Sequence, residues 1–254
     1  MTDAVNVTRQ GHIAILEVNR PPTNYFDVEV LTFLADTGLR LAEEGVRAIV
    51  LCSAGKHFCA GANFAQGDMA EARVESSRRI YAAAARMFEI PIPVVAAVQG
   101  SAVGGGLGLA CAADFRVAAE SSRFHANFSS LGFHQGFGLS ASLPRIVGEQ
   151  QASRLLLTSA RLTGAQAHAI GLVDELVADD RIRESAIELA ETIANRAPLA
   201  VGSIRKTLRG TLAEDVKRVL DHEISEQTWL WQTADCAEGI AANLERRDAV
   251  YTGH

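Results

Sequence analysis

Two glycine-rich loops carry the residues best suited to chemistry. The first spans residues 55–63 (GKHFCAGAN) and the second spans residues 104–106 (GGG), and each follows a short apolar run. Residues with little or no side chain leave their backbone N–H groups open to close approach. Two such groups aimed at one point can hold a carbonyl oxygen and stabilise an oxyanion or an enolate. The sequence therefore predicts a backbone oxyanion site and leaves the reaction itself open.

Composition and charge favour a globular protein without nucleic-acid or membrane partners. The 254 residues are 48% hydrophobic and 21% charged, enough for one large domain or a core with a small appendage. The net charge of −6 disfavours non-specific nucleic-acid binding. We find neither an apolar stretch of about 18 residues nor an N-terminal signal segment, so we expect a cytoplasmic protein. The four cysteines lack the spacing of disulfide or metal sites, so we expect reduced thiols and no metal.

Apolar runs and helical spacing predict the elements that position the two loops. Buried strands are expected at residues 13–18, 46–52 and 94–98, with a further short strand within 117–128. The second and third of these strands lead directly into the two loops. Helices are expected at residues 31–41, 73–88, 107–113, 179–195, 198–208, 212–231 and 235–246, with only helices from about residue 150 onward. Successive strands about 45 residues apart, with helices between them, favour parallel pairing in an α/β fold.

Motifs spread over the whole chain resemble the crotonase superfamily of enoyl-CoA hydratases and isomerases. They lie in the family's order at residues 58–63, 100–107, 114–118, 143–148, 169–174 and 238–247. The resemblance implies a spiral of ββα units, with a crotonase core at residues 1–195 and a helical C-terminal trimerisation region at residues 196–254. It also implies an acyl-CoA thioester as substrate, no cofactor beyond the CoA of that substrate, and assembly into a homotrimer or homohexamer.

The same resemblance assigns the two donors of the oxyanion hole. By motif position they are the N–H groups of Ala62 and Gly105. Gly105 stands where a helix is expected to begin, so its N–H would be unpaired at the positive end of the helix dipole. The alternative is that these glycines only let a helix pack tightly against a strand. Further substrate contacts are expected from Ala60, Gly61, Gly104 and Phe128.

Two residues depart from the pattern of the family's hydratases. Those enzymes carry two glutamates, one three residues after the second oxyanion-hole glycine and one twenty residues later. The corresponding positions here hold Gly108 and Phe128, and neither side chain can transfer a proton. A positioned acid or base contributes roughly 100- to 10,000-fold to a rate. We therefore expect little hydration of a simple enoyl-CoA.

Two histidines are candidates to replace the missing glutamates. His134 and His125 lie in the loop and strand that border the family's acyl pocket, and an imidazole titrates near neutral pH. The alternative is a structural histidine, hydrogen-bonded within the loop or at a trimer contact. Asp68 and Glu71 are further candidates, although acidic residues at a helix start usually just complement the dipole.

Three functional hypotheses follow from the residues and the resemblance. The first is a lyase or isomerase that stabilises a thioester enolate with atypical proton-transfer groups. The second is a non-catalytic homologue that binds acyl-CoA, and the third is a scaffold that keeps only the trimeric fold. Phe128, Phe133 and Phe137 indicate a bulky, apolar or aromatic acyl pocket, although a packed core would use the same residues.

Overall fold

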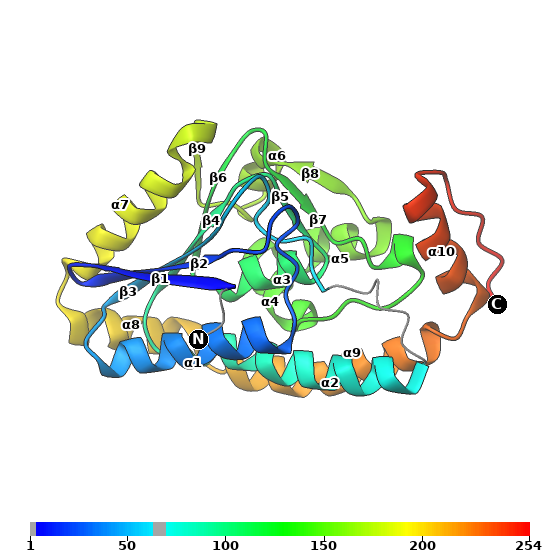
Figure 1. Ribbon diagram of the computed structural model, residues 1–254, viewed down its shortest axis with the longest axis horizontal. Helices are drawn as coiled ribbons and strands as arrows, with labels where there is room; N and C mark the ends of the chain where they lie inside the picture. The colour runs from blue at the N-terminus through cyan, green and yellow to red at the C-terminus, as the bar shows by residue number, and fades with distance from the viewer. Residues whose placement is uncertain (1–3, 63–69) are drawn as a thin grey trace.

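A computed structural model describes residues 4–62 and 70–254, which form two β-sheets surrounded by helices (Figure 1). The strands are β1 (Val5–Gln10), β2 (Ile13–Val18), β3 (Ala48–Ser53), β4 (Val94–Val98), β5 (Ser101–Val103), β6 (Phe115–Ala119), β7 (Arg123–His125), β8 (Arg161–Thr163) and β9 (Glu175–Val177). The α-helices are α1 (Val28–Glu43), α2 (Ala70–Met87), α3 (Gly105–Ala112), α4 (Leu139–Val147), α5 (Glu149–Thr158), α6 (Gly164–Ala169), α7 (Ile182–Ala194), α8 (Pro198–Arg209), α9 (Leu212–Leu230) and α10 (Ala234–Glu245). Short 3-10 helices occur at η1 (Ser129–Leu131) and η2 (Asp179–Arg181). None of the helices described is both long and apolar enough to span a membrane.

Parallel pairing brings the two glycine-rich loops to one edge of the larger sheet. This sheet has the strand order β1-β2-β3-β4-β6-β9, and its pairs are parallel except for β1 with β2. The first loop follows β3 in the chain. The second loop follows β4 and then the short strand β5, which belongs to the smaller sheet. Because parallel neighbours end at the same edge, both loops lie where ligands of α/β sheets usually bind. The smaller sheet, β5-β7-β8, continues from this edge.

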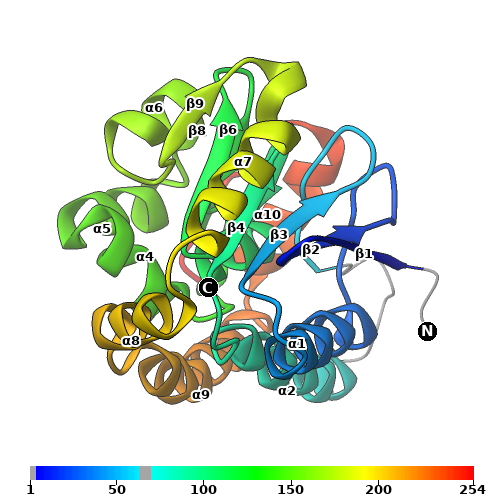
Figure 2. The same ribbon diagram turned by 90° about the vertical axis from the view of Figure 1, so that its left-hand side faces the viewer.

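Side chains of the larger sheet alternate between two cores. Ala48, Val50 and Cys52 of β3 pack in a cluster with α7, whereas Ile49 and Leu51 belong to the main core. Helix α7 lies across this face of β3, β4 and β6 (Figure 2). Because both faces are covered, the central strands β3 and β4 are buried along their whole length and almost entirely apolar, which is typical of a parallel sheet.

The C-terminal helices pack on the core of their own chain. Helices α1, α2 and α9 lie side by side below the sheet (Figures 1 and 2), and α9 also contacts α4. Helix α10 contacts η1 at the end of the molecule opposite α7 (Figure 1). The division of the chain at residue 195 falls in the turn between α7 and α8, and it stays a prediction.

Most predicted elements are present, with ends shifted by a few residues, but two expectations are wrong. Residues 117–128 contain parts of two strands, β6 and β7, and Phe128 lies beyond both. Strands β8 and β9 also lie in the C-terminal part, where only helices were expected. Each has three residues, which is too short for a periodic pattern to identify.

Candidate active site

Backbone hydrogen bonds hold the first loop against the strand that precedes the second. The Cys59 N–H donates to the Ser101 carbonyl oxygen, and the Val103 N–H donates to the Cys59 carbonyl oxygen, both at 3.0 Å. On the other side of the loop, the Phe26 N–H donates to the Gly61 carbonyl oxygen at 3.0 Å. Residues 59–62 therefore form a short extended segment between Phe26 and β5. Isolated parallel bridges pair Phe26 with Ala62 and Cys59 with Ala102.

The two loops approach too closely for side chains. A Cβ atom on Gly106 would lie 2.1 Å from the Cys59 carbonyl oxygen, and one on Gly61 would lie 3.3 Å from the Gly105 nitrogen. The first distance is well inside van der Waals contact, so an alanine there would force the backbones apart. Gly61 also has φ of +92°, a region that glycine adopts readily. Glycine is thus required for this packing of one backbone on the other.

Two backbone donors at this contact are unused. The N–H groups of Ala62 and Gly105 have no acceptor among the described residues. Gly105 is the first residue of α3, so its N–H lacks an intrahelical partner and lies at the positive end of the helix dipole. The preceding N–H, on Gly104, instead donates to the His125 carbonyl oxygen at 2.8 Å. Adjacent loops therefore offer one open amide each.

A cavity of about 400 Å³ lies at these two loops. Its described lining is Tyr25, Phe26, Ala60, Gly61, Ala62, Tyr81, Gly104, Gly105, Asn127, Phe128, Leu131, Phe133, Gly136, Trp231, Ile240, Asn243 and Leu244. The structure thus brings together all six residues predicted for the oxyanion hole and the substrate contacts. Their roles stay predictions. The residue after α9 and three residues of α10 complete the wall, a contribution that no motif in the sequence predicts.

Aromatic rings form much of the wall. The centroids of Phe128 and Phe133 are 5.9 Å apart with an interplanar angle of 85°. Phe133 in turn meets Trp231 at 6.3 Å and 61°. Edge-to-face pairs of this kind stabilise each other beyond the burial of their area. The position of one expected glutamate is therefore part of a rigid aromatic cluster.

The position of the other expected glutamate is filled by a neighbouring ring. A Cβ atom on Gly108 would lie 2.5 Å from the Cβ of Phe137, which is fully buried. The residues after Phe137 are held by Glu223 of α9, whose carboxylate accepts from the N–H groups of Gly138 at 2.9 Å and Ser140 at 3.0 Å. Burial raises the pKa of Glu223 to about 7. Glu223 thus supports the start of α4 and, through it, the ring that covers Gly108.

The two candidate histidines lie outside the described lining of the cavity. The Nδ1 atom of His134 is 2.9 Å from the Gln135 carbonyl oxygen, and its ring meets the ring of His222 at 5.8 Å. The side chain of His125 lies near Arg161, and burial together with that charge lowers its pKa to about 4. This placement does not support proton transfer by either residue in the cavity.

The further acid and base candidates were Asp68 and Glu71, which follow Asn63 of the first loop. Asn63 of the first loop and Asp68 lie outside the described residues, as does the side chain of Glu71. Among the described lining residues, the ionisable side chains are Tyr25 and Tyr81.

Tyr81 is a lining residue that sequence reasoning missed. Its hydroxyl donates to Gln227 Oε1 at 2.9 Å, and Gln227 Nε2 donates to the His134 carbonyl oxygen at 2.8 Å. Burial raises the pKa of Tyr81, so its phenol stays protonated at neutral pH. Helical periodicity places Tyr81 on a buried face of α2, but only the packing of α2 against α9 brings it to the cavity.

Comparison with known proteins identifies the family. The sequence model of the family described as enoyl-CoA hydratase/isomerase matches residues 8–254, nearly the whole chain. The chain belongs to the enoyl-CoA hydratase/isomerase family. It is thereby a member of the crotonase superfamily, as the motifs predicted, and this family acts on acyl-CoA thioesters.

Individual family members are similar over their whole length. YngF of Bacillus subtilis, named as an enoyl-CoA hydratase/isomerase, is 34% identical over 259 residues, with 100% of both chains covered. A carnitinyl-CoA dehydratase of Salmonella enteritidis is 28% identical over 262 residues, again with 100% of both covered. The crystal structure of an enoyl-CoA hydratase/isomerase from Pseudoalteromonas atlantica has a TM-score of 0.85 at 28% identity, covering 98% of this chain and 100% of that one. These likenesses confirm the predicted crotonase fold with its helical C-terminal region.

The raised pKa of Glu223 predicts a pH-dependent stability. The Glu223 carboxyl binds its proton more tightly in the folded protein than in the unfolded chain, because its pKa rises from 4.5 to about 7 on folding. The stabilisation is therefore fully present below pH 4.5 and is lost as the pH rises to about 7. Glu223→Gln should remove this loss, so its unfolding free energy should rise relative to the wild type by roughly 3 kcal/mol across that interval.

Urea unfolding at several pH values measures this difference. Glu214→Gln, on the exposed first turn of the same helix, is the matched control and should keep the pH profile of the wild type. Parallel profiles for Glu223→Gln and the wild type would show that the carboxyl does not titrate in this range.

Proposed function

We propose that this chain is an enzyme that binds an acyl-CoA thioester with its carbonyl oxygen between the N–H groups of Ala62 and Gly105. The observation that carries the proposal is the pair of open amides on two loops in backbone contact at one cavity. Membership of a family that acts on acyl-CoA thioesters supplies the substrate class. The cavity volume of about 400 Å³ falls in the range of small-molecule sites.

The proposed chemistry is the stabilisation of a thioester enolate. Two hydrogen bonds to the carbonyl oxygen withdraw charge from it, which makes the adjacent C–H more acidic and lowers the energy of the enolate. The dipole of α3 adds to this effect, because Gly105 stands at its positive end. The donors belong to the backbone and are fixed before the substrate binds, so little reorganisation is needed during the reaction.

The residues near the site favour a lyase or isomerase reaction other than simple hydration. By family resemblance, Gly108 and Phe128 stand where hydratases carry glutamates, and aromatic rings occupy both regions. The ionisable groups in the described lining are two tyrosines, so proton transfer would use a phenol, the substrate itself or a residue outside the described part. The second candidate function is acyl-CoA binding without catalysis, which the lack of a carboxylate or imidazole in the described lining favours.

Deuterium exchange tests the proposed enolate directly. The protein is incubated in heavy water with butanoyl-CoA or octanoyl-CoA, and mass spectrometry follows label next to the carbonyl. Gly61→Ala should reduce the exchange rate about 100-fold or more, because its methyl group would lie 3.3 Å from the Gly105 nitrogen and disturb one donor.

The matched control is Gly11→Ala in the turn between β1 and β2. Gly11 also has positive φ, +57°, but a Cβ atom there would meet nothing within 4 Å. Both variants carry backbone strain, and only Gly61→Ala should lose exchange. Exchange no faster than in protein-free solution, with the esters still bound, would contradict the enolate and favour the non-catalytic binder. Failure to bind any ester would contradict both and favour the scaffold.

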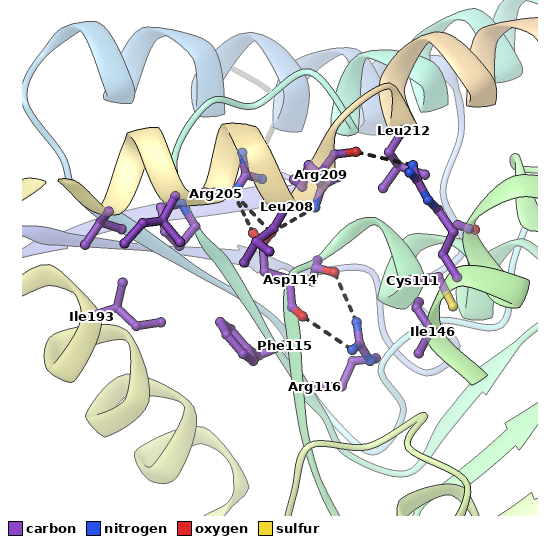
Figure 3. Close-up of a pocket in the computed structure, with 16 residues that line it drawn as sticks. Cys111, Asp114, Phe115, Arg116, Ile146, Ile193, Arg205, Leu208, Arg209 and Leu212 are labelled. Carbon is purple, nitrogen blue, oxygen red and sulfur yellow. Dashed lines mark hydrogen bonds and ion pairs between the residues drawn. The ribbon is translucent and has the colours of Figure 1, made fainter. Parts of the chain in front are cut away.

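We also propose that the chain assembles into a homotrimer or homohexamer through α8. This helix has no buried residue although it carries Leu199, Ile204 and Leu208, which are 89%, 60% and 78% exposed. A largely apolar groove of about 570 Å³ lies beneath it, and Figure 3 shows Leu208 above this groove. Exposed apolar surface of this extent is typical of a protein–protein interface.

Ion pairs fix α8 over the groove. Arg205 Nε and Arg209 Nη1 each lie 3.0 Å from carboxylate oxygens of Asp114 (Figure 3). Arg205 also donates to the Ile90 carbonyl oxygen at 2.9 Å. The helix is thus held in place by its charged face while its apolar side chains stay exposed. A second copy of the chain, seated on this face, would cover them.

Light scattering after size-exclusion chromatography tests the assembly. The wild type should have three or six times the mass of one chain, and Leu208→Glu should shift it to the monomer because a buried unpaired charge opposes association. Ser203→Glu adds the same charge to an exposed position of α8 outside the groove lining and should leave the mass unchanged. A monomeric wild type would contradict the proposal.

A further inference from the structure

The cavity next to the two loops has one wall made of three aromatic rings, in which Phe133 contacts both Phe128 and Trp231. Phe128 precedes η1, Phe133 follows it, and Trp231 caps the C-terminus of α9. The rings meet at interplanar angles of 85° and 61°, so successive rings are turned steeply relative to one another. Two segments far apart in the chain, the residues on either side of η1 and the end of α9, thus build a single wall.

From this wall we infer that the site takes a CoA thioester whose acyl group is an uncharged aryl ring, of the arylacetyl class. This inference rests on the proposed function, because it names the acyl group for the same site. A flat ring entering a cluster of steeply inclined rings can make both stacked and edge-to-face contacts, each favoured by the ring quadrupole. A flexible alkyl chain makes neither contact, and it loses more rotational freedom when it is bound.

Size and charge agree with such an acyl group. A cavity of about 150 Å³ is enough for a benzene molecule, so about 400 Å³ accommodates an aryl ring, its methylene and the thioester. The described lining contains no Asp, Glu, Lys, Arg or His side chain. A charged acyl group would therefore lose its hydration without gaining a partner from the described residues. Aromatic walls also have few rotatable bonds, so they keep their shape better than a lining of Met or Leu.

Binding measurements with two esters of equal carbon number test the inference. Phenylacetyl-CoA and octanoyl-CoA both have eight acyl carbons, and CoA alone is the third probe. Burial of apolar area alone would favour octanoyl-CoA, whereas ring contacts favour phenylacetyl-CoA. We expect calorimetry to give phenylacetyl-CoA an affinity about tenfold higher than octanoyl-CoA, which corresponds to one or two aromatic contacts.

Two tryptophans allow the ring contact to be located. The chain has Trp229, which is 55% exposed, and Trp231 in the cavity wall. In Trp229→Phe the remaining emission comes from Trp231, and phenylacetyl-CoA should change it saturably. In Trp231→Phe the remaining emission comes from Trp229 and should stay constant.

A matched pair of phenylalanine variants completes the test. Phe133→Leu should lower the affinity for phenylacetyl-CoA about tenfold and should change the affinity for octanoyl-CoA by less than about threefold. Phe33→Leu makes the same change on α1 outside the cavity lining and should affect neither ester. Equal or tighter binding of octanoyl-CoA would overturn the aryl inference and leave the proposed function standing. Failure of every ester to bind better than CoA alone would overturn both.

Discussion

The close contact between two backbones is the constraint on which the site depends. The segment around Cys59 and Gly61 lies against the start of α3 at distances that leave no room for a Cβ atom on Gly106. Hydrogen bonds to β5 fix this contact, and the parallel sheet delivers both loops to the same edge. The Gly105 N–H is open because this residue begins α3, and the Ala62 N–H has no acceptor among the described residues.

The surroundings of these amides are largely apolar and aromatic. Phe137 packs against Gly108, and Phe128 belongs to a cluster of rings closed by Trp231. Glu223 contributes from outside the cavity, since it holds the backbone that follows Phe137. The two backbone donors thus lie beside a wall of apolar and aromatic side chains, the environment on which the proposed enolate chemistry rests.

Much of the core could be predicted because its signals are local. Strand β4 has the predicted bounds, and small residues directly after apolar runs mark both loops, at residues 55–63 and 104–106. Strand β1 gave no such signal, because most of its side chains are exposed and polar. Strands β8 and β9 are too short to show a period.

The remaining site residues depend on packing between distant segments. Tyr81 reaches the cavity because α2 packs on α9, and Trp231 does so because the chain turns back after α9. His134 lies in the expected loop, but left-handed residues at Gly132 and Gly138 turn this loop so that its ring meets His222. Spacing along the chain contains no information about such turns, so the roles of His134 and His125 stay predictions.

A crystal structure of the protein with butanoyl-CoA would test the central claim most directly. The thioester oxygen should lie about 2.7–3.2 Å from the nitrogen atoms of both Ala62 and Gly105, the range of an ordinary N–H···O hydrogen bond. A thioester oxygen bonded to only one of these amides, or held elsewhere in the cavity, would contradict the account.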